Sequence, residues 1–427
     1  MKFSVSPPPR DYAPTTDHVL LRKQKMSIHP FLGPRVRRLR LGLGLSQTEL
    51  AERTNVAAGA ISMTETGRLD VDDSVITALA QVLDCSAEYL VKAHAERPFG
   101  TPQLRAYADA SQRTVDRTIA DSVTAIDAAR TLDLKLVRDQ VPVYEGDLNE
   151  DEGIERFAAE TRSVAGLDSN EVVGNVIRTA ERLGCVVLPM DSELGRHLGL
   201  SLRIDEVPVI RVSRSSADPD GTIPGDRQRF TVAHELGHLV LHNGAPQPTS
   251  PVEASKLEKQ AHLFAAAFLV PGDSLLSDLN DAGGRVTLTT LVKLKEKWGY
   301  SVKAFVVRFR QLGVIDDDHA RSLYKQISAR RWNKVEPVPV GNESAIWMEK
   351  ALRKTFPTGH EAAVARESGL NASYFQRWTA WEAEAPSGST IAPVLQLQPA
   401  KNASDRSAPF STARVASLPV RQAFGRG

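Results

Sequence analysis

The sequence has little cysteine, no long apolar run and almost no net charge. Its two cysteines, Cys85 and Cys185, lie far apart and form no Cys-x-x-Cys pair, so we expect buried thiols in a reducing compartment. No apolar run reaches the roughly 18 residues that a membrane helix needs. The first residues, Met1-Lys-Phe-Ser-Val-Ser-Pro-Pro-Pro, lack the apolar stretch of a signal peptide. These absences predict a cytoplasmic protein with no membrane partner.

Charges of the two signs balance, with 53 lysines and arginines against 52 aspartates and glutamates. The whole chain therefore does not attract nucleic acid through its net charge. A length of 427 residues predicts two or three domains. Residues 1–40 are strongly basic, with nine basic and two acidic side chains and hence a net charge of +7. We expect a disordered basic tail over residues 1–30, followed by a folded helix whose Arg35 to Arg40 cluster suits phosphate contacts.

Residues 31–95 have the pattern of a small all-helical bundle. Ser46 followed by Glu49 is a capping box that begins a helix, and Thr54-Asn55 makes a tight turn. Two short helices joined by such a turn follow the helix-turn-helix plan, in which the second helix enters the major groove of DNA. The second of these helices is expected at residues 58–65, and the apolar spacing predicts further short helices at 76–83 and 87–91.

This segment resembles the Cro/C1-type (XRE) DNA-binding domain in its motifs Leu45-Ser-Gln, Ile61-Ser62, Glu65-x-Gly67 and Leu79-Ala80-x-x-Leu83. The resemblance implies phosphate contacts from Arg38 and Gln47. It implies base contacts from the second helix, through Ala58, Ala60, Ser62 and Met63. Alanine and glycine cannot make the bidentate hydrogen bonds that discriminate bases, so DNA is the expected partner with weak base readout. The alternative is a helix-turn-helix that serves dimerisation or docks a partner repressor.

Residues 96–150 are expected to be a helical linker. Positions 103–138 contain neither glycine nor proline and show a helical rhythm of apolar residues. They predict a long helix or a helical pair between two domains. The same apolar spacing would equally suit the interface of a homodimer.

The segment from Arg229 to His242 carries the pattern His-Glu-x-x-His at His234, Glu235 and His238. Residues four apart lie one turn above each other on a helix, so both imidazoles can reach one cation. Glu235 is offset from that line, which suits a carboxylate that takes a proton from water. His242, one turn further on, fits a cap of the helix end better than an additional ligand.

A catalytic zinc site needs a third protein ligand. The best candidate is Glu258, in a second apolar helix that ends near Pro271. A polar turn from Asn243 to Ser255 would make the two helices antiparallel and bring Glu258 beside the histidines. Together with Gly237, which lets another segment approach closely, the pattern predicts a Zn2+ site.

These motifs, together with Glu258-x-x-Ala-x-x-Phe264-Ala265, make residues 150–315 similar to the ImmA/IrrE family of bacterial metallo-endopeptidases. The resemblance implies that His234, His238 and Glu258 bind zinc and that Glu235 is the general base. The family usually has Asn or Asp four residues after the third ligand. This chain has His262 there, so the contact that orients a ligand imidazole is changed or comes from the His262 ring.

The remaining patterns complete a multidomain, mainly α-helical fold. A helix is expected at residues 171–183, and strands at 186–189, 198–204 and 207–212 form a small sheet. We therefore expect an α+β zincin-like domain over residues 151–320. A helical region at 321–385 and a disordered tail at 386–427 would follow.

Taken together, the motifs predict a transcriptional regulator with a zinc-dependent endopeptidase domain. The family resemblance implies that its substrate is a helix-turn-helix repressor, cleaved after stress or in the control of mobile elements. The alternative is a transcription factor whose zinc domain senses a ligand or metal without proteolysis. A third hypothesis is self-cleavage between the two domains.

Overall fold

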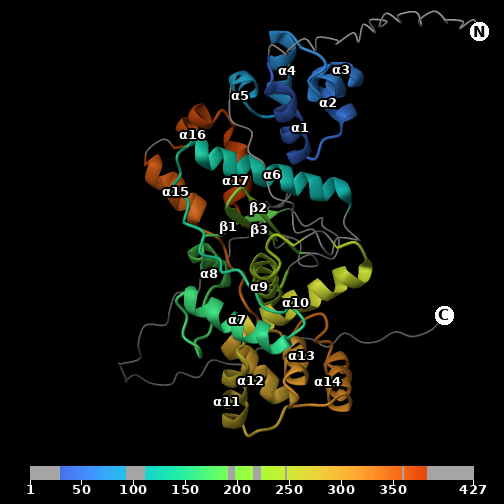
Figure 1. Cartoon of the computed structure of the whole chain (residues 1–427), viewed down its shortest axis with the longest axis vertical. Helices are drawn as coiled ribbons and strands as arrows, with labels where there is room; N and C mark the ends of the chain where they lie inside the picture. Colours follow the sequence, from blue (N-terminus) through green and yellow to red (C-terminus); the bar gives the residue numbers. More distant parts are fainter. Residues whose placement is uncertain are drawn as a thin grey trace, which may run out of the picture. The chain divides into compact units, whose positions relative to one another are not determined.

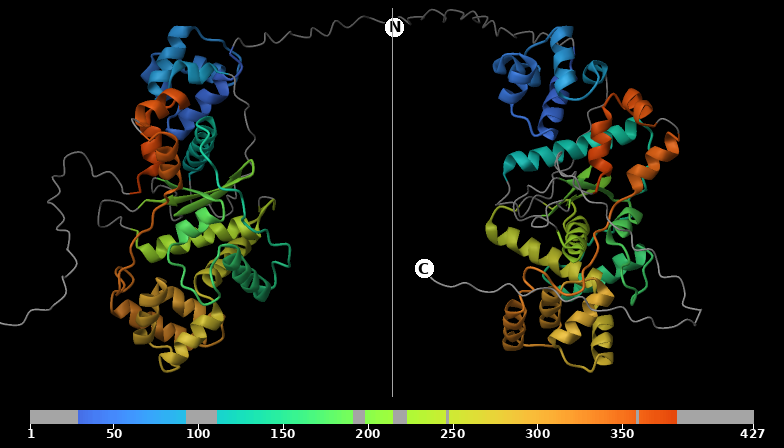
Figure 2. Two further views of the ribbon diagram at one scale, coloured as in Figure 1. Left: turned by 90° about the vertical axis from the view of Figure 1, so that its left-hand side faces the viewer. Right: turned by 180° about the vertical axis from the view of Figure 1, so that it is seen from behind.

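The computed structural model describes residues 29–92, 111–190, 198–214, 223–245, 248–357 and 360–381. Over these residues the chain is mainly helical and contains a small three-stranded sheet, as the sequence predicts (Figures 1 and 2). Apart from residues 29 and 30, both predicted disordered tails lie outside the described residues. The first part of the predicted linker, residues 96–110, lies outside them as well.

The N-terminal part of the described chain forms the predicted helical bundle. Its helices are α1 (Leu32–Gly42), α2 (Gln47–Thr54), α3 (Ala58–Glu65), α4 (Asp73–Val82) and α5 (Ala87–Val91). The capping box is confirmed, because the Glu49 amide donates to Ser46 Oγ over 3.1 Å and the Ser46 amide donates to the Glu49 carboxylate over 2.6 Å. Asn55 then takes the left-handed conformation, with φ of 55°, that ends α2.

The helix predicted over residues 103–138 is shorter than expected. It is α6 (Gln112–Thr131), and residues 132–138 are not helical. Asp133 adopts a left-handed φ of 51°, and the Leu134 amide donates to the Ala129 carbonyl over 2.8 Å. This is a Schellman-type helix end. The sequence pattern did not mark it because glycine, the usual residue at such an end, is replaced by aspartate.

α6 is a core helix rather than a linker. Its apolar residues Val115, Ile119, Val123 and Ile126 are buried within the same chain. Gly42 of α1 lies so close that a Cβ there would stand 3.4 Å from the Asp121 amide nitrogen. Figure 1 shows α6 running between α1 and the sheet. The apolar face that would have suited a homodimer is therefore already covered within the chain. The homodimer remains a prediction, but this face of α6 cannot be its interface.

The three predicted strands are present to within two residues. They are β1 (Val186–Met190), β2 (Gly199–Ile204) and β3 (Val207–Ser213), in the order β1-β3-β2. β1 runs parallel to β3, and β2 runs antiparallel to it. The helix expected at 171–183 is the shorter α8 (Val176–Arg182), because the Asn175 side chain caps it by accepting from the Arg178 amide over 2.8 Å. α7 (Asp151–Val164) was not predicted; it starts in an acidic stretch that suits a helix N-terminus.

The sheet separates two cores. One face, with Val187, Ile210 and Val212, belongs to the core of the metal-motif helices. That core contains α9 (Gly225–Leu241), α10 (Pro251–Leu269), α11 (Gly272–Asp281), α12 (Leu288–Trp298), α13 (Val302–Gln311) and α14 (Asp317–Ala329). The other face, with Leu188, Leu202 and Val209, shares a core with α1, α6 and the C-terminal helices. The sheet is therefore a layer common to both halves of the chain.

The C-terminal helices pack against the helix-turn-helix bundle. They are α15 (Trp347–Thr355), α16 (His360–Ser368) and α17 (Ala372–Thr379). The Tyr374 hydroxyl donates to the Leu83 carbonyl over 2.8 Å, and the Ser86 amide donates to the Gly369 carbonyl over 2.8 Å. The helical region expected at 321–385 is therefore split between the two cores. α14 belongs to the core that contains α9, and α15, α16 and α17 belong to the core that contains α1.

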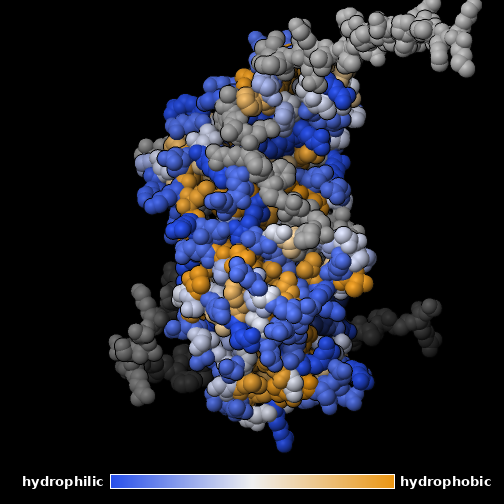
Figure 3. Space-filling model, in the orientation of Figure 1, coloured by the Kyte–Doolittle hydropathy of each residue, from blue (hydrophilic) through white to orange (hydrophobic). Residues whose placement is uncertain are grey.

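Among the described residues, no helix combines the length and the apolarity that crossing a bilayer would require. On the face drawn in Figure 3, hydrophilic residues cover most of the surface and apolar residues form separate patches.

Candidate metal centre

The helices α9 and α10 carry the predicted metal ligands and pack closely side by side. Gly237 allows this approach, because a Cβ there would stand 3.0 Å from the Phe264 ring and 3.2 Å from the Ala261 carbonyl oxygen. The close packing turns Glu258 of α10 toward His234 and His238 of α9. The two helices therefore meet at the ligands expected from the sequence, although α10 begins at Pro251, earlier than predicted.

The ligand atoms of these three residues converge, all within 4.8 Å of one another. His234 Nε2 lies 3.3 Å from one Glu258 carboxylate oxygen, and His238 Nε2 lies 3.2 Å from the other. The two Nε2 atoms stand 3.1 Å apart. Ligands about 2.1 Å from a tetrahedral zinc ion stand about 3.4 Å apart, so the spacing and the donor types fit Zn2+.

The charge state of Glu258 also suits a cation. Burial acts to raise the pKa of its carboxyl group, but the neighbouring His234 and His238 rings outweigh burial and hold that pKa far below the usual range. Glu258 therefore stays ionised, as a metal ligand must.

A chain of buried hydrogen bonds fixes the tautomer of His238. Gln260 donates from its amide nitrogen to the Leu148 carbonyl over 2.6 Å, so its side-chain oxygen faces His242. His242 Nε2 stands 3.0 Å from that oxygen and donates to it, which leaves His242 Nδ1 to accept from His238 Nδ1, also 3.0 Å away. His238 Nε2 is then free of a proton and turned toward Glu258. The sequence assigned His242 to capping the helix end; its backbone is at that position, but its ring serves this chain.

We expect the substitution His242→Ala to weaken zinc binding by about 10–100-fold, because it removes the group that orients a ligand imidazole. Competition with a chromogenic chelator measures the affinity. Gln260→Leu should have a similar effect, whereas His319→Ala, which changes an exposed histidine of α14, should have none. Unchanged affinity in both His242→Ala and Gln260→Leu would contradict the orienting role.

Glu235 lies beside the three converging residues but is not one of them. Its side chain is buried, with 5% of the residue exposed, and it accepts a hydrogen bond from Ser201 Oγ over 2.8 Å. Burial raises the pKa of Glu235 to about 7, against the opposing effects of His234 and Ser201. Such a carboxyl group can both accept and return a proton near neutral pH.

The strand β2 shapes the space around Glu235. A Cβ at Gly199 would stand 2.8 Å from both Cγ and Oε1 of Glu235 and 2.6 Å from the Thr231 methyl group, so only glycine leaves room there. Sequence reasoning missed Gly199 and Ser201. The one available signal was a glycine within a predicted strand, which often marks a close approach of another segment.

His262 stands beside the site but does not orient a ligand imidazole. Its Nδ1 donates to the Glu258 backbone carbonyl over 2.8 Å, and its ring stacks on Phe230 with centroids 5.5 Å apart. The ring also contacts that of His234, with centroids 4.5 Å apart. His234 Nδ1 is buried without a hydrogen-bond partner among the described residues. The expectation that a ring nitrogen of His262 fills the orienting role is therefore wrong for this structure.

In the helix-turn-helix bundle, the expected phosphate contacts point toward protein groups. Arg38 forms an ion pair with Asp127 of α6 over 2.6 Å and a hydrogen bond with the Tyr89 hydroxyl over 3.3 Å. Gln47 donates to the Glu65 carboxylate over 2.8 Å. Because the sequence gives no sign that α6 packs here, it could not show that the Arg38 charge would be compensated.

The outer face of α3 is open and mostly apolar. Ala58 and Met63 are exposed, with Met63 at 44%, and Ala60 and Ser62 are half-buried. Few hydrogen-bond donors are offered on this face, in line with the weak base readout expected for DNA.

Two family models match this chain, in the order that the sequence predicted. Residues 36–90 match a helix-turn-helix model, and residues 180–310 match the M78 peptidase model, described as the IrrE N-terminal-like domain. The second match contains both histidines, Glu235 and Glu258. The chain is also 25% identical over 334 residues to a protein of Cereibacter sphaeroides named propionyl-CoA carboxylase regulator. The aligned part covers 69% of this chain and 72% of that protein. The chain thus combines a helix-turn-helix module with a metallopeptidase-type domain.

Proposed function

We propose that this protein is a transcriptional regulator whose second domain is a zinc-dependent endopeptidase. The observation that carries the proposal is the arrangement of four side chains. His234, His238 and Glu258 converge with the spacing of zinc ligands, while Glu235 stands apart from them, buried and held by Ser201. A purely structural zinc site is usually closed by four protein ligands and has no use for such a carboxylate.

In this mechanism His234, His238 and Glu258 would hold the zinc ion. The ion supplies the polarisation of a peptide carbonyl and the acidity of a water molecule. Glu235 accepts a proton from that water at its carboxylate and passes it to the leaving amine. The Ser201 hydroxyl keeps the Glu235 carboxylate in one orientation throughout.

The strand β2 would help to bind the substrate. It stands at one end of the strand order β1-β3-β2 of the described sheet. An extended peptide can pair with such a strand. Since Ser201 and Gly199 of β2 both touch Glu235, a peptide on this strand would pass the general base. We infer that the substrate is a protein, and that a helix-turn-helix repressor would fit the role of a regulator.

A second function is favoured by the shared sheet. The outer face of the sheet packs in one core with α1 and α6, so a change at β2 or β3 has a packed route to the DNA-binding module. The Cereibacter sphaeroides protein is itself named a regulator. In this alternative the metal domain senses a ligand or a metal and cleaves nothing.

The two functions differ in one assay. Zinc-loaded protein is incubated with purified helix-turn-helix repressors encoded by neighbouring genes, and products are identified by mass spectrometry. Cleavage that stops with a chelator and returns with added zinc supports the peptidase. Intact repressors, together with zinc-dependent DNA binding by the protein, would support the sensor instead. A zinc-dependent truncation of the protein itself would support self-cleavage.

A further inference from the structure

A broad groove lies beside α8 and α15 and the segment that follows α6 (Figure 1). Its volume is about 850 Å³, and part of its lining is apolar, from Val137, Ile346, Trp347 and Ala351. Val137 is 42% exposed, and the half-buried Trp347 is fixed by a hydrogen bond from its Nε1 atom to the Lys135 carbonyl over 3.0 Å. The groove therefore offers apolar surface that the described residues leave open.

The lining of the groove is basic. Five basic and two acidic side chains face it, which gives a net charge of +3. The buried acid, Glu181, accepts hydrogen bonds from two backbone amides of the segment before α15 and lies 3.8 Å from Arg178. The other four cations are exposed and form no ion pair among the described residues: Lys135, Arg182, Lys350 and Lys354.

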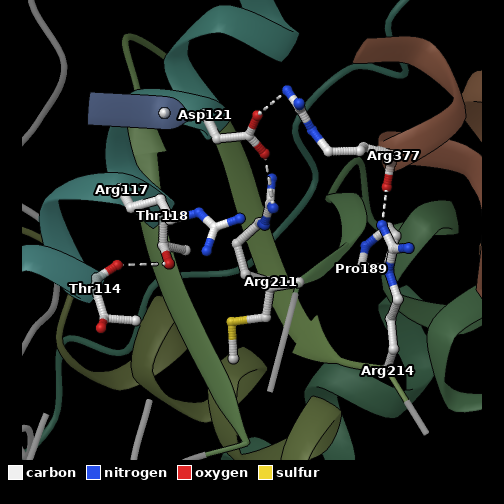
Figure 4. Close-up of a pocket in the computed structure, with 10 residues that line it drawn as sticks. Thr114, Arg117, Thr118, Asp121, Pro189, Arg211, Arg214 and Arg377 are labelled. Atoms are coloured by element: carbon white, nitrogen blue, oxygen red, sulfur yellow. Dashed lines mark hydrogen bonds and ion pairs between the residues drawn. The ribbon is translucent and has the colours of Figure 1, made fainter. Parts of the chain in front are cut away.

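Figure 4 shows the contrasting case of a charge cluster inside the chain. Arg211 pairs with Asp121 over 2.8 Å, and Arg377 pairs with the same carboxylate over 3.4 Å. The charge of those two arginines is compensated by a residue of α6. The four exposed cations of the groove have no such carboxylate, so their charge is available to an acidic partner.

An acidic segment of suitable charge lies a few residues further along the same chain. Residues 145–152 read Glu-Gly-Asp-Leu-Asn-Glu-Asp-Glu, with five acidic side chains and no basic one. All five are exposed, and none forms an ion pair within the described ranges. The nearby Lys256 bonds to Asn149. Val143, two residues before the segment, is 43% exposed. The acidic segment thus combines negative charge with exposed apolar surface, as the groove combines positive charge with it.

We propose that the acidic segment of one copy docks in the groove of a second copy, so that two chains form a symmetric dimer. The charges of the two surfaces are complementary, and their exposed valines would supply the apolar centre that a charged rim surrounds. This interface takes the place of the α6 face, which is covered within the chain. Its existence does not depend on peptidase activity.

The positions of the two surfaces allow both contacts to form at once. Val137 and Glu145 are eight residues apart, so they lie at most about 29 Å from each other. A standard interface buries about 800 Å² on each partner, a patch about 30 Å across, and can contain both surfaces. Around a two-fold axis each copy donates its acidic segment and receives that of its partner, so the contact is made twice.

The test is the oligomeric state of the full-length protein, measured by sedimentation velocity over a range of concentrations. We expect a wild-type dimer at low salt that dissociates at about 1 M salt, where the screening length falls to about 3 Å. Lys350→Glu/Lys354→Glu reverses charge in the groove, and Glu145→Lys/Glu152→Lys reverses it in the acidic segment. Each double variant alone should raise the Kd of the dimer at least about tenfold.

A mixture of the two double variants makes the test specific. In the mixed dimer each groove again faces a segment of opposite charge, so association should return to about the wild-type Kd. Native mass spectrometry identifies the mixed dimer by its mass. Lys303→Glu/Lys325→Glu, at exposed positions of α13 and α14, makes the same charge change outside both surfaces and should dimerise as the wild type does.

Three results would overturn the proposal. The first is a wild type that stays monomeric at low salt, which would leave the groove to another acidic ligand. The second is a dimer whose Kd neither double variant changes, because its interface would then lie elsewhere. The third is a mixture that fails to recover while both variants keep the wild-type Tm, because two folded proteins with restored charge pairing would then not associate.

Discussion

Replacing Glu235 by glutamine is expected to slow peptide cleavage by about 10²–10⁴-fold, because the variant loses the proton acceptor. The amide is nearly the same size as the carboxylate, so the packing against Gly199 is retained. Zinc content should stay at the wild-type level, because Glu235 does not belong to the converging ligand atoms. The measurement is the cleavage rate of an identified substrate at matched zinc occupancy.

Two comparisons make this result specific to the base. Glu296→Gln, an exposed position on α12, makes the same chemical change and should cleave at the wild-type rate. Ser201→Ala leaves the carboxylate in place but removes the hydrogen bond that orients it, so a smaller loss of kcat with unchanged zinc is expected. Cleavage by Glu235→Gln at the wild-type rate would rule out this residue as the base. Normal gene regulation by a Glu235→Gln protein that cannot cleave would favour the sensor.

Removing a metal ligand should have the second large effect. We expect about one zinc ion per wild-type chain, and a strongly reduced zinc content for Glu258→Ala and His234→Ala, since each leaves only two protein ligands. A ligand that binds only the folded state stabilises it by about 2.7 kcal/mol when the free ligand concentration is a hundred times its Kd. Chelation should therefore lower the Tm of the wild type and leave that of the two variants almost unchanged.

Metal analysis after dialysis and thermal unfolding with and without chelator are the two measurements. His319→Ala, outside the site, should retain both the zinc and the chelator-dependent shift. Wild-type zinc affinity in Glu258→Ala would show that α10 supplies no ligand and would remove the basis of the peptidase. A wild-type chain without zinc under zinc-replete conditions would leave a DNA-binding regulator as the remaining function.

The sequence predicted those parts of the site that depend on local periodicity. The spacing of His234 and His238 along one helix face determines where their rings point, and the second apolar helix determines where Glu258 meets them. The strands also followed from their apolar runs. The two faces of the sheet pack against different helices, but the apolar run of each strand marks that strand in the sequence without reference to those helices.

The sequence did not predict contacts between elements far apart in the chain. Ser201 meets Glu235, and Gln260 meets His242, only after the sheet and the two helices have packed. The linker was misjudged for the same reason, because apolar spacing shows that α6 buries a face but not which partner covers it. The compensation of Arg38 by Asp127 depends on that same packing.

The hydrogen bond between Tyr374 and Leu83 has a consequence for folding during synthesis. The two residues are 291 positions apart, and the later one completes the core of the DNA-binding module. At a ribosomal rate of about 5–20 residues per second, that module waits roughly 15–60 s for its last helix. A prematurely terminated chain would therefore carry a helix-turn-helix with an uncovered apolar side. Only a chain translated past α17 would bring a DNA-binding module with a finished core to the chromosome.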